Sequence, residues 1–109
     1  MKLLTKAILK KLPKLGAMGG HNGLQSTEPM AIVKFFNPCG YATWFASEFD
    51  GEDTFFGWAI LHPGCGEYGY FSLSELQSIK LRFGPFGLGI ERDMHFTPCL
   101  MSEAIKRYE

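Results

Sequence analysis

The sequence predicts an α+β fold in which an antiparallel β-meander of about four strands is flanked by short N-terminal, middle and C-terminal helices. Ten Phe and thirteen Gly favour aromatic packing between strands that are joined by tight turns. Apolar and charged residues make up 46% and 20% of the 109 residues, as in ordinary globular domains. A chain of this length builds one hydrophobic core, so residues 1–109 are expected to form a single domain.

The first expected element is a short amphipathic helix that follows Thr5 and ends at Pro13. Thr5 is a good N-cap, and Pro13 cannot continue the helical hydrogen bonds. The apolar stripe consists of Leu4, Ile8 and Leu12. We expect this stripe to dock on the sheet while lysines face water, because an isolated helix this short is unstable. Residues 16–29 are Gly-rich, polar and aperiodic, and are expected to form a loop.

The meander is predicted from three apolar and aromatic runs, at residues 30–36, 41–49 and 54–62. Residues 37–40 and 50–53 have turn chemistry, and connections this short join antiparallel strands.

The rest of the chain is expected to add one strand, two helices, a loop and a short extended piece. In chain order these are a strand at 68–71, a helix capped by Ser72 or Ser74, a loop at 84–89, an extended piece at 94–96 and a helix capped by Ser102 that runs through Tyr108.

Charge is distributed unevenly although the net charge is zero. Residues 1–15 carry five Lys and no acid, whereas residues 35–79 contain no Lys or Arg. The acids of that second span are Glu48, Asp50, Glu52, Asp53, Glu67 and Glu75. A basic end and an acidic middle suit either contact with a partner or pairing within the folded chain.

The three cysteines, Cys39, Cys65 and Cys99, are odd in number and widely spaced, which favours reduced thiols in a cytosol. We expect a cytoplasmic protein, since Lys6 interrupts the N-terminal apolar run and no small-residue cleavage site follows. No apolar stretch approaches the roughly 20 residues that span a bilayer, so no membrane contact is expected.

The stretch E-F-D-G-E-D, residues 48–53, is the densest group of carboxylates. Aromatic residues follow at once, so the spacing does not match a calcium-binding loop. Gly51 can adopt a positive φ and Asp50 can accept hydrogen bonds from the backbone two residues on, which favours a solvated hairpin turn. Glu48 differs, because strict alternation would place it beside Trp44 and Ala46, partly desolvated.

Other groups give weaker signals. His62 and Cys65 stand as H-x-x-C and could form a zinc site with Cys39, Cys99 or His95, or a nucleophile pair, but no C-x-x-C pair is present. We therefore predict no metal and no cofactor. Arg92, in the triplet Glu91-Arg92-Asp93, could clamp an anion or pair with an acid of the meander.

Five separated runs resemble a family of small uncharacterised proteins encoded on bacterial plasmids and other mobile elements. They are M-K-L-L-T-K, V-K-F-F, E-F-D-G-E-D-T-F-F-G, G-Y-F-S-L-S-E-L and I-E-R-D-M-H-F-T-P. The resemblance covers nearly the whole chain. It implies a bacterial cytoplasmic setting and an accessory role in transfer, maintenance or evasion of host defence, but it carries no catalytic or binding residues.

These observations favour a non-enzymatic module that binds a protein partner, or inhibits a host factor, through an acidic and aromatic surface centred on the second hairpin. The residues predicted to contact the partner are Trp44, Glu48, Asp50, Glu52, Asp53, Glu91, Arg92 and Asp93. One alternative is a small hydrolase or transferase, which requires Glu48, Arg92 and Asp93 to converge on one substrate. A second alternative is nucleic-acid binding through the basic N-terminal helix. We do not expect it, because the aromatic strands lack interleaved Lys and Arg.

The nucleic-acid alternative predicts retention on heparin and on single-stranded DNA at low salt. Replacing Lys6, Lys10 and Lys11 with Glu would abolish that retention. If the unmodified protein flows through both columns, the alternative is excluded.

Overall fold

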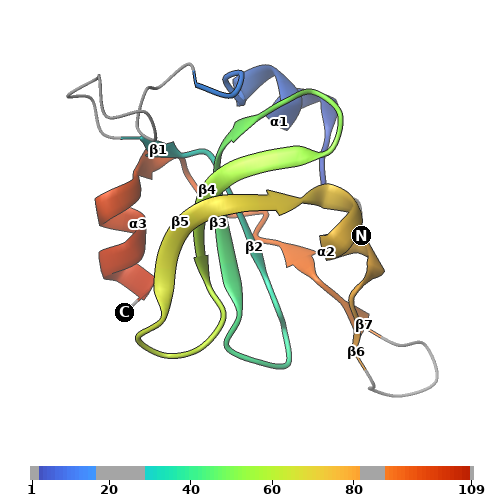
Figure 1. The fold of residues 1–109 in the computed structure, drawn as a ribbon, viewed down its shortest axis with the longest axis vertical. Coiled ribbons are helices and arrows are strands. Elements are labelled where there is room, and N and C mark those ends of the chain that lie inside the picture. The colour runs from blue at the N-terminus through green and yellow to red at the C-terminus, as the bar shows by residue number, and fades with distance from the viewer. Residues whose placement is uncertain (1–2, 17–28, 82–87, 109) are drawn as a thin grey trace.

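A five-stranded antiparallel sheet lies at the centre of the protein (Figure 1). The structure is a computed structural model that describes residues 3–16, 29–81 and 88–108. The strand order is β5-β4-β3-β2-β8. The strands are β2 (Val33–Phe36), β3 (Thr43–Phe49), β4 (Thr54–Ile60), β5 (Gly66–Ser72) and β8 (Glu91–Arg92). The first four follow in chain order, which confirms the predicted meander, and β8 adds a fifth strand beside β2.

In the part of the chain that the structure describes, three short helices and two small two-stranded sheets surround the main sheet. The helices are α1 (Lys6–Lys11), α2 (Leu73–Ser78) and α3 (Met101–Tyr108). The small sheets pair β1 (Met30–Ala31) with β9 (Cys99–Leu100), and β6 (Lys80–Leu81) with β7 (Leu88–Gly89). The α+β prediction with three flanking helices is thus confirmed. No helix in the described ranges is long and apolar enough to cross a membrane.

Each face of the sheet buries a separate hydrophobic cluster. The first core joins α1 and α2 to one face and contains Leu3, Leu4, Val33, Phe35, Trp44, Ala46, Phe49, Phe55, Phe71, Leu76 and Ile90, with Ile8 and Leu12 packed against it. The second core joins α3 to the other face and contains Ala31, Phe45, Ile60, Cys99, Met101 and Ala104. The predicted docking of the N-terminal helix through its apolar stripe is therefore confirmed.

Two of the three predicted helix starts are confirmed by their capping bonds. Thr5 Oγ1 accepts the Ile8 N–H at 3.3 Å, and Ser72 Oγ accepts the Glu75 N–H at 3.0 Å. The prediction that Ser102 caps the last helix is wrong, because α3 already begins at Met101. The Met101 N–H donates to the Pro29 carbonyl at 2.9 Å, so a backbone group from a distant segment satisfies this donor at the start of the helix.

A β-bulge in β3 changes which side chains share a face. The register with β4 shifts between Ala46 and Glu48, which leaves one extra residue on β3. Beyond the bulge, Phe49 rejoins Trp44 in the first core, and Glu48 lies opposite Phe56. The prediction that Glu48 shares a face with Trp44 and Ala46 is therefore wrong, because the extra residue reverses the alternation.

Three further boundaries differ from the sequence prediction or lie outside the described residues. The predicted strand at 30–36 divides at Ile32, because β1 pairs with β9 and β2 pairs with β3. Residues 94–96, predicted as extended, include a turn that is closed by a 2.9 Å bond from the His95 N–H to the Asp93 carboxylate. Of the predicted loop at 16–29, residues 17–28 lie outside the described residues, as do residues 84–87 of the predicted loop at 84–89. Leu88 and Gly89, predicted as part of that loop, form β7 instead.

We predict that the sheet tolerates no side chain at Gly57 of β4. A Cβ there would lie 1.9 Å from the Phe45 carbonyl oxygen of the neighbouring strand. Gly57→Ala should therefore lower the free energy of unfolding by about 3 kcal/mol or more, measured by urea denaturation.

The matched control is Gly69 of β5, which pairs directly with Gly57. A Cβ on Gly69 would meet no described atom within 4 Å, so Gly69→Ala should leave stability unchanged or raise it slightly. Equal losses in the two variants would contradict the prediction.

Candidate functional site

Asp50 closes the hairpin between β3 and β4. Its Oδ1 accepts the backbone N–H groups of Glu52, Asp53 and Thr54 at 2.8, 2.8 and 3.0 Å. Gly51 adopts a φ of 90°, which suits a residue without a Cβ. These three bonds lower the pKa of Asp50 below its ordinary value, because they stabilise the charged carboxylate. The bond from the Glu52 N–H has the largest effect. The predicted hairpin turn is confirmed.

Asp53 joins the hairpin to α2. Its carboxylate accepts the Ser74 N–H at 2.8 Å and the Ser74 hydroxyl at 2.7 Å. The Asp53 carbonyl oxygen also accepts the Leu73 N–H at 2.8 Å. Asp53 therefore supplies acceptors for the first turn of a helix that lies 21 residues away in the sequence.

Glu48 and Trp44 lie inside the protein rather than on its surface. Glu48 is 1% exposed, and its Oε1 accepts the Gly16 N–H at 2.9 Å. This burial agrees with the expected desolvation, although it occurs on the opposite face of the sheet from the one predicted. Trp44 is 7% exposed and packs in the first core. Of the four carboxylates at residues 48–53, Glu52 remains as an exposed group at the hairpin tip beside Asp50.

The structure does not bring the three residues of the hydrolase alternative together. Arg92 of β8 pairs with Phe35, whose side chain belongs to the first core. Glu48 pairs with Phe56, which lies on the opposite face with the second core. Directly paired residues of an antiparallel sheet point to the same side, so Glu48 and Arg92 lie on opposite faces.

Glu91 and Arg92 lie on opposite faces of the sheet, because they pair with the consecutive residues Phe36 and Phe35 of β2. Asp93 forms an ion pair with Lys34, with Oδ2 3.8 Å from Nζ. Arg92 and Asp93 both line a hollow of about 200 Å³, together with Ile8 and Lys11 of α1. The triplet therefore does not form one polar site.

An apolar groove crosses the hairpin tip between α1 and α2. It consists of two adjoining hollows of about 240 and 490 Å³, which share Leu9, Phe49 and Gly51. We call these hollows together the hairpin groove. The first is also lined by Leu4, Glu52, Leu73 and Gln77, and the second by Leu12, Lys14, Leu15 and Asp50. Leu9 is 42% exposed and Leu15 is 36% exposed, so apolar surface faces solvent beside two carboxylates.

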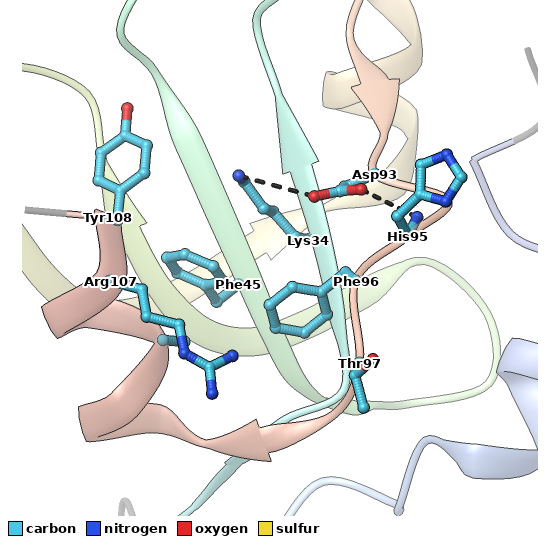
Figure 2. Close-up of a pocket in the computed structure, with 9 residues that line it drawn as sticks. Lys34, Phe45, Asp93, His95, Phe96, Thr97, Arg107 and Tyr108 are labelled. Atoms are coloured by element: carbon cyan, nitrogen blue, oxygen red, sulfur yellow. Dashed lines mark hydrogen bonds and ion pairs between the residues drawn. The ribbon is translucent and has the colours of Figure 1, made fainter.

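Another hollow, which we call the α3 cleft, lies between α3, the sheet and the segment that follows β8 (Figure 2). Its volume is about 360 Å³, and it is lined by Lys34, Phe45, Asp93, His95, Phe96, Thr97, Ala104, Arg107 and Tyr108. Sequence reasoning did not identify this cleft, because the contributing side chains come from four distant segments. The sequence did not mark Lys34 or Arg107 as binding residues, because each lies outside the basic run at residues 1–15.

The cysteines do not gather with other metal ligands. Cys39 and Cys65 are exposed and Cys99 is buried in the second core. Within residues 3–16, 29–81 and 88–108, no group of three or more His, Cys, Asp or Glu side chains is placed to hold a metal ion.

The structure has a small α+β fold that carries a hollow on each side of one antiparallel sheet. The chain belongs to a family described as Protein of unknown function (DUF2958), whose family model matches residues 3–107. This finding confirms that the chain belongs to a family without an assigned function. The expected plasmid or mobile-element origin stays a prediction. No curated protein and no solved structure matches the chain.

The bonds to Asp50 predict a dependence of stability on pH. Because the folded-state pKa is lowered, the stabilisation is present above the unfolded-state pKa of about 3.9 and is lost as pH falls toward the folded-state value. Asp50→Asn should therefore lower the melting temperature at pH 7, and its difference from the unmodified protein should shrink below about pH 4.

Glu52→Gln is the control, since it removes one charge from the same turn without removing the acceptor of the three N–H groups. Its melting temperature at pH 7 should stay close to that of the unmodified protein. A gap between the Asp50→Asn variant and the unmodified protein that persists at acid pH would contradict the assigned role of the carboxylate.

Proposed function

We propose that this protein is a protein-binding module and that its partner docks in the hairpin groove. The observation that carries the proposal is the exposure of Leu9 and Leu15 next to Phe49 and the acidic hairpin tip. An exposed apolar hollow with a polar rim is typical of a protein-binding surface. An apolar side chain of the partner would fill the hollow and exclude water from the three apolar residues.

The charge of the groove favours a partner segment that also carries Lys or Arg. Asp50 and Glu52 line the hairpin side of the groove, and Lys14 lines the α1 side. The ion pairs Lys34–Asp93 and Arg107–Glu103 do not involve either hairpin acid. A basic residue of the partner would meet these two carboxylates, and the attraction would be screened by salt.

The resemblance to plasmid-encoded proteins directs the search for the partner toward basic proteins of a bacterial host. Inhibition of such a host factor, as an accessory function of a mobile element, is part of the same proposal. The proposal keeps two of the eight residues predicted to contact the partner, since Glu91, Arg92 and Asp93 do not line the groove. Glu52 and Asp50 remain at the interface, while Glu48, Trp44 and Asp53 support it from within the fold.

The proposal is tested with Leu9→Ser and Glu52→Lys, because neither change removes a bond that closes the hairpin. The tagged protein is used to capture partners from bacterial host lysate at low and moderate salt, and retained proteins are identified by mass spectrometry. The affinity of each purified candidate is then measured for every variant. Both changes should weaken binding by about tenfold or more, and binding should weaken as salt increases.

The matched control is Glu67→Lys, which makes the same charge change at an exposed position of β5 that does not line the groove. Its affinity should equal that of the unmodified protein. Failure to retain any protein, or equal binding by all variants, would exclude the groove as a docking site.

A further inference from the structure

We propose that the α3 cleft binds a small organic monocarboxylate that has an aromatic or other compact apolar body. This site is separate from the hairpin groove and does not depend on a protein partner. The proposal rests on two cations from different elements that reach over a floor of aromatic rings. Figure 2 shows the Lys34 ammonium and the Arg107 guanidinium on either side of the space around Phe45.

The shape of the cleft follows from the residues of α3 that face the sheet. Ala104 is buried at this surface, and its small side chain leaves space that a larger residue would fill. Phe45 forms the floor, with the Phe96 ring centroid 5.8 Å and the Tyr108 centroid 6.2 Å away. The Tyr108 hydroxyl donates to the Tyr41 carbonyl, which fixes the ring at the end of the cleft. A volume of about 360 Å³ is sufficient for a small ligand.

The two cations retain donors for a ligand. Lys34 Nζ lies 3.8 Å from Asp93 Oδ2, and Arg107 Nη2 lies 3.7 Å from Glu103 Oε2. Both separations exceed the roughly 2.7–2.9 Å of a charge-assisted hydrogen bond, so a ligand anion can take the closer position. Lys34 Nζ also lies 5.7 Å from the Tyr108 ring centroid, which holds the ammonium near the cleft by a cation–π interaction.

The charge balance favours one negative charge on the ligand rather than two. The two cations and their acid partners sum to zero net charge. A carboxylate leaves this group with one excess negative charge, whereas a phosphate dianion leaves two and meets stronger repulsion from Asp93 and Glu103. The planar fork of Arg107 matches the two oxygens of a carboxylate, and the aromatic floor offers apolar contact to the rest of the ligand.

The test is a titration of the full chain with 3-phenylpropanoate, followed by NMR of the backbone amides. The amide signals of Phe96, Thr97 and Arg107 should shift in a saturable manner at millimolar ligand. The neutral 3-phenylpropanol and the dianionic phenyl phosphate should each bind more weakly. Absence of saturable shifts at the cleft, or binding by either comparison compound that equals or exceeds that of 3-phenylpropanoate, would overturn the proposal.

Variants assign the binding to the two cations. Arg107→Gln and Lys34→Gln should each weaken 3-phenylpropanoate binding by about tenfold, as expected for the loss of one charge-assisted hydrogen bond. Lys106→Gln makes the same charge change on the adjacent exposed residue of α3, which does not line the cleft, and should bind as the unmodified protein does. Retained amide spectra show that each variant is folded. Equal weakening in all three variants would overturn the assignment to the cleft.

Discussion

The irregular pairing of β3 with β4 decides which side chains reach each face of the sheet. One extra residue after Ala46 lets Phe49 return to the first core and turns Glu48 to the face opposite Trp44. The same pairing requires Gly57, because the Phe45 carbonyl occupies the space of a Cβ there. The position of the hairpin tip, and hence of the hairpin groove, follows from this short stretch of backbone. A regular alternation would exchange the faces of the residues beyond the bulge.

The carboxylates of residues 48–53 have different physical roles. Asp50 accepts three N–H groups within its own turn, and Asp53 accepts from Ser74 at the start of α2. Glu48 is buried and accepts from Gly16, which ties the segment after α1 to the end of β3. Only part of the negative charge therefore remains available to a partner. Three of the four carboxylates at residues 48–53 therefore stabilise the fold by accepting hydrogen bonds, and the acidic surface is smaller than the sequence suggests.

The sequence predicted those parts of the fold that depend on neighbouring residues. Thr5, Ser72 and the turn at Asp50 act through bonds that span two to four positions, so their spacing was sufficient. Local sequence patterns gave wrong or incomplete predictions where a contact with a distant segment decides the structure. Ser102 is not the cap, because the start of α3 bonds to residue 29, and the fifth strand joins β2 across more than 50 residues. The α3 cleft was missed for the same reason, since Lys34 and Arg107 become neighbours of one hollow only after folding.

The position of α3 has a consequence for synthesis on the ribosome. The face of the sheet that holds Phe45 and Ile60 is made before the helix that covers it, because α3 follows every strand of the main sheet in the chain. Until Met101 and Ala104 emerge and pack there, this face exposes apolar surface to the crowded cell. A stalled or truncated chain that lacks α3 would therefore expose the apolar face of the sheet to solvent. Chaperones and proteases would act on that partly folded chain.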